Sequence, residues 1–560
     1  SLTTTPMMCA RLLRDKEHGR LYQASERVFA RVLRAYDRSL TWVLRHSLLT
    51  LFVFFVTLGL NVYLYIVLPK GFFPEQDTGR MSGTVIGDQD LSFTAMSTKL
   101  QRLAGIVQAD PAVDTVVAFT GGGGGTTTNT ARMFISLKPL AVRKVSVERV
   151  IDRLRPKLAR VPGASLFLQA NQDVRIGGRR SAAEYQYTLQ SDNLDELNHW
   201  GAVLLKTMHG LPAITDANSD AQNRGLAVNL TIDRATASRL GITPKAVDAV
   251  LYDAFGEREI ARTYASTNQY FVVMEVAPDF WQSPQALNRI YVASASGGMV
   301  PLAAFTKYQV STAALAVNHS GVFPSVTLSF NLAPGRALGD AVAAIGAAER
   351  AAGMPGTVTG YFSGTAQAFT ESLSNEWLLV AAAIAAVYIV LGILYESTIH
   401  PVTILSTLPS AGLGALLALA VTRTQFTIIA LIGIILLIGI VKKNAILMID
   451  FAIDVERRER RRPMDAVHQA CLLRFRPILM TTMAALLGGL PLALGTGTGS
   501  ELRRPLGISI VGGLMLSQAM TLYTTPVIYL YMDRLRLRVL RLFGRSAPES
   551  PGEIDAVPVR

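Results

Sequence analysis

The chain has 560 residues, half of them apolar and only 17% of them charged. This composition, with a mean hydropathy of +0.31, excludes an ordinary soluble domain and indicates a membrane protein with hydrophilic parts. The net charge of +13 is assigned to basic cytoplasmic loops and not to nucleic-acid binding, because positive residues gather on that side of membrane proteins. The two cysteines, Cys9 and Cys471, give no reason to expect disulfides or redox chemistry.

The N-terminal part reads as membrane-associated. Residues 1–13 have no charged stretch followed by an apolar core, so they are interpreted as the end of a preceding transmembrane helix and not as a signal peptide. Residues 20–46 place apolar side chains at helical spacing with arginines around the rest of the turn, which predicts an amphipathic helix on the cytoplasmic face. A first complete span is predicted over residues 48–68, ending at Pro69.

The long hydrophilic region, residues 70–375, contains no apolar stretch long enough to cross a membrane. Its strand and helix patterns follow the split βαβ order of ferredoxin-like units. They predict a first module over 70–184, a second module from 185–233 and 321–375, and an insertion over 234–320. Residues 226–232 are expected to form a strand of the second module. The predicted fold class is a polytopic α-helical membrane protein with a large α+β region.

Five further spans are predicted within residues 376–531, and a basic tail follows over 532–560. By the positive-inside rule the tail and the arginine-rich segment 456–462 are cytoplasmic, which places residues 70–375 on the outer side of the membrane. The arginine run alone could be a nucleic-acid patch, but the topology already accounts for it. The predicted spans are 376–395, 401–421, 426–452, 477–494 and 506–531.

The span over residues 426–452 contains Lys442, Lys443 and Asn444. An ionisable group at such depth costs at least about 2.5–3.5 kcal/mol, so these lysines need partners or a wet cavity. Lys442 could instead extend its ammonium to the membrane surface. Neighbouring helix positions point about 100° apart, so the ammonium groups of Lys442 and Lys443 cannot both extend to the membrane surface in one direction. Lys443 shares its side of the helix with Asp450.

The next span places hydroxyls at membrane depth, on Thr481 and Thr482, with Arg474 and Arg476 at its entrance. A lysine with hydroxyls, an amide and a carboxylate partner has the parts of a proton relay. The five spans offer no deep carboxylate besides Asp450, so the relay is incomplete within this sequence.

Other chemistries find little support. The glycine-rich segment 120–130 lacks the GK[ST] ending of a phosphate-binding loop and is interpreted as a mobile connection between strands. The seven histidines do not cluster, and no metal-ligand spacing or GxSxG motif occurs. We therefore do not expect an enzyme, and we expect no cofactor.

Several long motifs carry a family resemblance: GFFPEQDTGRMSG (71–83), YIVLGILYESTIHP (388–401), IGIVKKNAILMIDFA (438–452) and RFRPILMTTMAALLGG (474–489). They resemble the RND (resistance–nodulation–division) exporters, most closely the multidrug, hydrophobe/amphiphile branch with its MdtB/MdtC-like subunits. The resemblance covers essentially the whole chain, but only the second half of a family member.

The resemblance implies a drug/proton antiporter driven by the proton-motive force. Lys443, Asn444, Thr481 and Arg474 match the family's relay positions, and the two partner aspartates lie in an N-terminal half that this sequence does not contain. The resemblance further implies a homo- or heterotrimer in the inner membrane of a Gram-negative bacterium. Its partners would be a periplasmic adaptor and an outer-membrane channel, its substrates amphiphilic small molecules, and residues 70–375 would form porter modules with a docking insertion.

In the family, the glycine-rich segment that begins at Gly121 is a switch loop beside the drug pocket, and Phe119 and Phe134 match aromatic pocket positions. The alternative is that both rings pack in the core of the module. The five consecutive glycines leave this loop unusually free.

Two other functions remain open. A metal-ion exporter of the same family would need converging Met, His or carboxylate ligands, whereas Met81, Met133, Met208 and Met274 are scattered along the sequence. A chain of 560 residues that acts alone could instead be a non-transporting assembly or binding partner.

Overall fold

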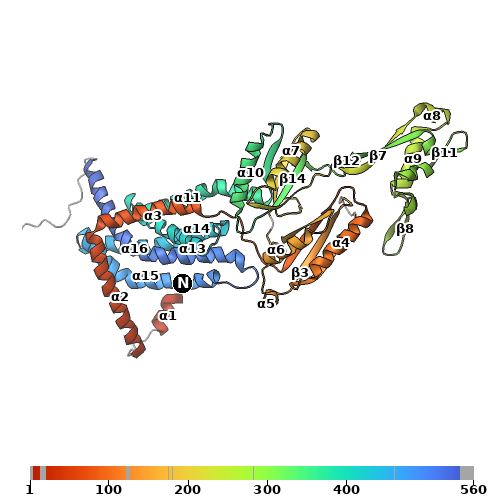
Figure 1. The fold of residues 1–560 in the computed structure, drawn as a ribbon. Coiled ribbons are helices and arrows are strands. Elements are labelled where there is room, and N and C mark those ends of the chain that lie inside the picture. Colours follow the sequence, from red (N-terminus) through yellow and green to blue (C-terminus); the bar gives the residue numbers. More distant parts are fainter. Residues whose placement is uncertain are drawn as a thin grey trace, which may run out of the picture.

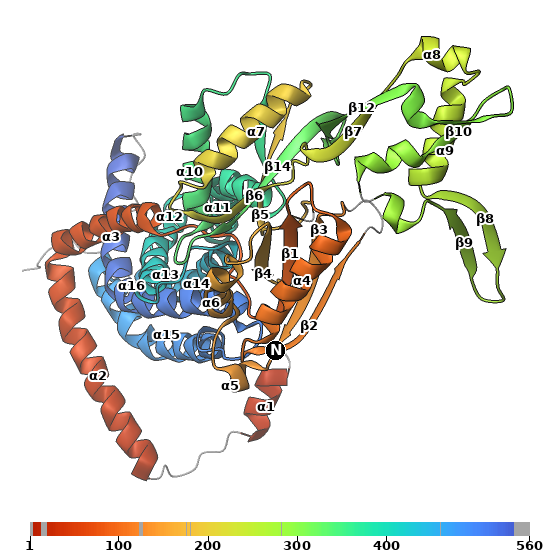
Figure 2. The same ribbon diagram turned by 45° about the vertical axis from the view of Figure 1, so that its right-hand side comes forward.

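The computed structural model describes residues 4–12, 20–121, 127–174, 176–179, 181–281, 283–459 and 461–542. A bundle of long helices forms one end of the molecule, two α/β modules lie beside it, and a smaller insertion lies at the far end of a two-stranded arm (Figures 1 and 2). The predicted mixture of membrane helices and α+β modules is therefore confirmed.

Six helices of the described chain are long and apolar enough to cross a membrane, which agrees with the six complete spans that the sequence predicts. Two begin well before the predicted start. α15 begins at Pro463, a residue favoured in the first helical turn, and α11 begins at Thr365 inside the second module and continues without a break. The helices are α3 (Ser47–Val67), α11 (Thr365–Tyr395), the pair α12 (Ile399–Leu405) and α13 (Leu408–Val421), α14 (Ile428–Glu459), α15 (Pro463–Ala493) and α16 (Ser500–Leu542).

Two helices precede the bundle, α1 (Thr4–Leu12) and α2 (Arg20–Arg45), and α2 has the predicted amphipathic character. Tyr36, at the middle of its apolar face, is buried, stacks on Phe475 with ring centroids 4.5 Å apart and donates a hydrogen bond to the Leu522 carbonyl at 2.9 Å. Residues 1–3 and 13 of the predicted first segment, and residues 543–560 of the tail, lie outside the described residues.

The first module is a four-stranded antiparallel sheet in the order β2-β3-β1-β4, with α4 and α6 on one face. Side chains alternate across the sheet, so Met133 and Ile135 face the helices whereas Arg132 and Phe134 lie on the opposite, open face. The strand–helix order is the predicted one. The elements are β1 (Arg80–Gly87), α4 (Phe93–Gln108), β2 (Val113–Thr120), β3 (Thr130–Leu137), α5 (Leu140–Arg143), α6 (Val147–Leu158) and β4 (Ala164–Ala170).

The second module has a five-stranded sheet in which β13, β14, β5 and β15 are neighbours and β6 pairs with β14. Its core contains large, fully buried side chains such as Tyr187 and Phe330. The elements are β5 (Tyr185–Gln190), α7 (Leu194–Met208), β6 (Ile214–Ser219), β13 (His319–Ser320), β14 (Phe323–Leu332), α10 (Leu338–Ala352) and β15 (Thr359–Ser363).

The prediction that residues 226–232 belong to this sheet is wrong. They form β7 (Gly225–Ile232), which pairs with β12 (Thr306–Ala313) to make the arm that leads to the insertion. The place in the sheet is taken by β6, whose sequence ITDANS is mostly polar and has little intrinsic strand preference. Pairing with β14, more than 100 positions later, makes it a strand.

The insertion has a small core of its own, which includes Val247, Val292 and Phe305. The hairpin of β8 and β9 projects from it, with nearly every residue exposed (Figure 2). The elements are α8 (Arg234–Arg239), α9 (Pro244–Phe255), β8 (Arg258–Tyr264), β9 (Gln269–Met274), β10 (Tyr291–Ala293), β11 (Met299–Pro301) and the short 3₁₀ turns Pro278–Phe280, Pro284–Arg289 and Leu302–Ala304.

A backbone pairing joins the segment after α3 to the segment that opens α14. The Phe426 amide donates to the Pro69 carbonyl at 2.9 Å, and the Gly71 amide donates back to the Phe426 carbonyl at 3.0 Å. The Ile428 amide donates to the Phe72 carbonyl at 3.2 Å. Two segments about 350 positions apart in the sequence are thus held together where the hydrophilic modules meet the bundle.

The same junction contacts the second module. The Phe72 ring is buried in that module's core, with its centroid 6.3 Å from that of Phe369. The Gly339 amide, at the start of α10, donates to the Lys70 carbonyl at 3.0 Å. The start of α14 is therefore linked to the second module and, through residues 70–80, to the first.

Candidate functional site

Lys443 lies on an open stripe of α14. Ile432, Leu436, Gly439, Lys443 and Asp450 are all exposed and recur at helical spacing. A side chain added at Gly439 would meet no atom within 4 Å. Among the described residues, neither Lys443 nor Asp450 forms an ion pair. Charged side chains at membrane depth need partners, and within the described chain this stripe lacks them.

Asn444, the next residue along the helix, points to another side of α14, into the bundle, where it is buried. Its amide donates to the Thr482 hydroxyl of α15 at 3.0 Å and to Oε1 of Gln518 of α16 at 3.2 Å. The Thr482 hydroxyl donates to the same Gln518 oxygen at 2.6 Å. These three side chains therefore tie three membrane helices together through one hydrogen-bonded cluster.

The structure thus separates the four predicted relay residues. Lys443 lies on the open stripe and Asn444 in the buried cluster, whereas the Thr481 hydroxyl donates to the Ile478 carbonyl of its own helix at 3.1 Å. The Arg474 guanidinium lies over the Phe451 ring at 4.9 Å, and its buried Nε has no hydrogen-bond partner in the part of the chain described. Sequence reasoning missed Gln518, although an amide inside a predicted span was a usable signal.

Gln518→Leu is expected to destabilise the bundle by about 0.6–2 kcal/mol, because it leaves the Asn444 amide and the Thr482 hydroxyl without their common acceptor. The measurement is the thermal unfolding of the purified transporter in detergent. Gln469→Leu is the matched control, since the Gln469 Oε1 is buried but has no partner among the described residues. Equal losses in both variants would contradict a structural role for the cluster.

A cavity of about 1370 Å³ lies between the two modules, and Thr498 and Gly499 of the loop before α16 also line it. One wall is the open face of the first module's sheet, which no helix of the described chain covers. The other wall is formed by the second module around Asn218, Asp220 and Thr327. The cavity therefore combines surfaces from both modules and the bundle.

Phe119 and Phe134 lie on the open wall and not in the core of the module. The two residues are 52% and 46% exposed, and their rings stack with centroids 5.7 Å apart. The alternative that both rings pack in the core is therefore wrong. Gly121 follows with φ of +99°, a conformation that requires glycine, and an added Cβ would lie 2.9 Å from the Phe93 ring. Residues 122–126, most of the expected switch loop, lie outside the described residues.

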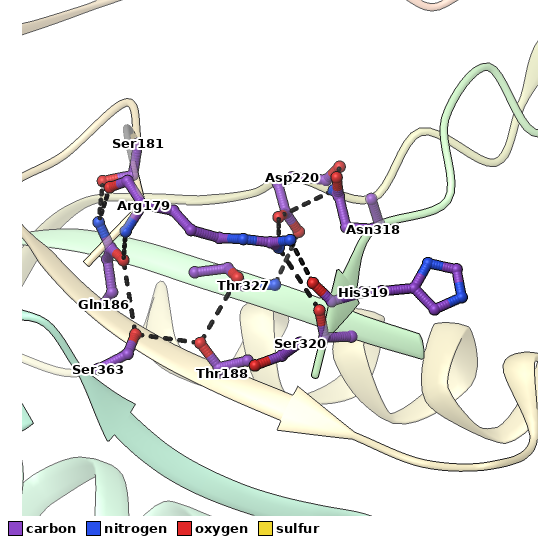
Figure 3. Close-up of polar contacts among 12 residues, drawn as sticks. Arg179, Ser181, Gln186, Thr188, Asp220, Asn318, His319, Ser320, Thr327 and Ser363 are labelled. Carbon is purple, nitrogen blue, oxygen red and sulfur yellow. Dashed lines mark hydrogen bonds and ion pairs between the residues drawn. The ribbon is translucent and has the colours of Figure 1, made fainter. Parts of the chain in front are cut away.

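On the second wall, a charged pair is built into a polar network (Figure 3). The Arg179 guanidinium lies 3.9 Å from the Asp220 carboxylate and donates to the His319 carbonyl. Asp220 accepts hydrogen bonds from the Thr327 amide at 2.7 Å and from the Asn318 side chain at 3.0 Å. Burial raises the pKa of Asp220 above its ordinary value, and the Thr327 hydrogen bond and the Arg179 charge oppose this shift.

The family model described as AcrB/AcrD/AcrF matches residues 1–533 of the chain, which includes both walls of the cavity and the lysine-bearing helix. The chain belongs to the AcrB/AcrD/AcrF family. This membership confirms the resemblance to RND multidrug efflux transporters.

Relatives within the AcrB/AcrD/AcrF family are named Multidrug resistance protein MdtC. The chain is 54% identical to that of Yersinia enterocolitica serotype O:8 over 542 residues, which are 96% of this chain and 52% of the relative. It is 53% identical to that of Escherichia coli O157:H7 over 552 residues, covering 98% of this chain and 54% of the relative. The chain thus spans about half the length of the curated relatives it matches.

Two crystal forms of a heavy metal efflux pump have the same fold. They superpose with TM-scores of 0.81 and 0.80 at 21% identity, covering 90% of this chain and 53% and 52% of those chains. At this identity the likeness extends to the fold alone.

Proposed function

We propose that this chain is the C-terminal half of a proton-driven multidrug exporter in the inner membrane of a Gram-negative bacterium. One observation carries the proposal. Lys443 faces away from the chain's own bundle on the open stripe of α14, and the segment that opens α14 is hydrogen-bonded to the entry of the hydrophilic modules. A charge without an ion-pair partner among the described residues thus lies on a helix whose opening segment is hydrogen-bonded to residues 69–72.

The proton-coupled step follows from electrostatics. Aspartates of an N-terminal half pack on the open stripe and attract the Lys443 ammonium while they are ionised. Protonation of these aspartates removes the attraction, so α14 takes a different position in the two protonation states. The Arg474 guanidinium, whose Nε has no hydrogen-bond partner among the described residues, and the Thr481 hydroxyl supply further donors on the neighbouring helix.

The movement reaches the substrate through the backbone. Residues 426–428 carry a shift of α14 to residues 69–72, and from there to the core of the second module through Phe72. The two walls of the cavity belong to the two modules, so a relative movement of the modules changes the cavity. An exporter needs such a link between the proton site and the substrate site.

The cavity suits amphiphilic substrates. Its volume of about 1370 Å³ exceeds the roughly 300–1,000 Å³ of an ordinary drug site, which favours a range of large compounds. The rings of Phe119 and Phe134 offer an aromatic surface, and the opposite wall is polar. The relatives' name, multidrug resistance protein, supports the same class of cargo.

Assembly into a homo- or heterotrimer with a periplasmic adaptor and an outer-membrane channel completes the proposal. The hydrophilic modules then lie in the periplasm, and the exposed β8–β9 hairpin of the insertion serves as a docking element. The alternative of metal-ion export would need a set of metal ligands, and the described residues contain no group of three His, Cys, Asp or Glu side chains that could hold a metal ion.

Proteoliposomes of the complete transporter test the proposal. A fluorescent amphiphile is expected to move when a pH gradient is imposed, and to stop moving when a protonophore collapses the gradient. Liposomes that contain this chain alone serve as the control and should move neither protons nor dye. Dye movement that is indifferent to the gradient would contradict proton drive, and transport by this chain alone would contradict its role as one half.

A further inference from the structure

Two arginines on the open face of the first module's sheet have charges that no described residue neutralises. Arg132 of β3 lies between Phe119 of β2 and Thr84 of β1, and Arg80 begins β1 on the same face. Both line the cavity. The side chain of neither forms a hydrogen bond or an ion pair with another described residue.

The cavity's other charges do not cancel them. Arg179 and Asp220 are occupied by each other and by the network of Figure 3. The remaining charged residue of the described lining is Asp173, a single carboxylate beside two guanidiniums that have no partner among the described residues. The cavity therefore presents an excess of positive charge, and this excess lies on the wall that also carries the aromatic rings.

Unpartnered polar atoms mark the same region. Ser82 Oγ, Asn171 Oδ1 and Gln172 Nε2 are buried, line the cavity and have no hydrogen-bond partner in the described chain. Buried polar groups are nearly always hydrogen-bonded. Three such atoms without a partner in one wall therefore indicate that a ligand or water forms hydrogen bonds with them. Ser82 is directly opposite Phe134 and two positions from Arg80 on the same strand.

We propose that Arg132 binds the carboxylate head of an amphiphilic substrate whose apolar body lies on Phe119 and Phe134, and that Arg80 adds to the positive charge of the same wall. Guanidinium groups pair with carboxylates through two parallel hydrogen bonds, which makes arginine selective for a planar acidic head. Arg132 and Phe134 are two positions apart on one face of β3, about 6–7 Å, so one small molecule reaches both. Arg132 is then a specificity-determining residue of the transport site, an assignment that rests on the proposed function.

Three probes with one fluorescent apolar body and different heads, a carboxylate, a neutral amide and a trimethylammonium group, test the proposal. Binding is measured by fluorescence anisotropy on the complete, purified transporter in uncharged detergent. Arg132→Gln is expected to weaken the binding of the carboxylate probe by about tenfold or more, and to change the affinity for the other two probes by less than about twofold. Arg80→Gln should change the affinities in the same direction. Arg132→Lys should restore part of the loss, because it returns the charge without the paired donors.

Arg102→Gln is the matched control, since Arg102 is an exposed arginine of α4, the helix on the opposite face of the same sheet. Equal weakening of all three probes by Arg132→Gln, or no change in any, would overturn the proposal. So would the absence of saturable binding of every probe, which is expected if an acidic protein segment covers this face. Head-selective binding without transport in proteoliposomes would refute the exporter and leave the arginine site standing. Gradient-driven transport without head selectivity would refute the arginine site and leave the exporter standing.

Discussion

Lys443→Ala in the complete transporter is expected to lower proton-coupled export by at least tenfold. In the proposed mechanism the variant leaves the aspartates of the N-terminal half without their counter-charge, and an uncompensated charge at this depth costs at least about 2.5–3.5 kcal/mol. Since about 1.4 kcal/mol is a factor of ten, the variant is held in the state in which those aspartates are protonated. The measurements are dye transport and proton flux in proteoliposomes and drug susceptibility in cells.

The neighbouring lysine supplies a matched control for this experiment. Lys442 has the same side chain and nearly the same depth but points to another side of α14, where it is half-buried. Lys442→Ala should keep most of the export, provided that both variants reach the membrane in equal amounts. Full drug resistance in the Lys443→Ala strain would remove Lys443 from the relay. Equal loss in both variants would show that the helix needs basic character and not one positioned ammonium.

Phe72→Ala is expected to destabilise the second module by about 3–5 kcal/mol, as other buried phenylalanine truncations do. Phe72 is 5% exposed, and its ring contacts Phe73 and Phe369 edge to face. The ring also fixes the segment that pairs with residues 426–428, so export should fall with stability. Thermal unfolding of the purified transporter, together with proteolysis of the hydrophilic modules, measures the change.

Phe73→Ala is the control for this prediction, because Phe73 is only partly buried against the same core. Phe73→Ala should lower the stability of the second module clearly less than Phe72→Ala does, and it should leave export close to that of the unmodified protein. An unfolding temperature of Phe72→Ala that matches the unmodified transporter would mean that the junction does not depend on this ring.

The sequence predicted the parts of the fold that depend on local pattern. Six apolar segments of spanning length and the strand–helix order of the first module are visible within short windows, and both are confirmed. Membership of β6 and β7 in particular sheets was not predictable in this way. It is decided by pairing with β14 and β12, which lie far along the chain.

In the candidate sites, too, the features set by local pattern were predictable and those set by long-range packing were not. Helical geometry alone indicates that Lys443 and Asn444 face different sides, and the structure places them so. It does not indicate that Asn444 meets Thr482 and Gln518, because the rotation of three helices about their axes is set by packing throughout the bundle. Likewise, strand alternation puts Arg132 beside Phe134, but only the assembled modules show that this face borders a cavity.

The continuous helix α11 has a mechanical consequence. It runs for 31 residues from the second module into the membrane, a rod of about 46 Å at about 1.5 Å per residue. A rod of that length converts a rotation of about 5° at its membrane end into a displacement of about 4 Å at the other. Small tilts of α11 at its membrane end are therefore amplified into movements as large as a side chain at its start in the second module.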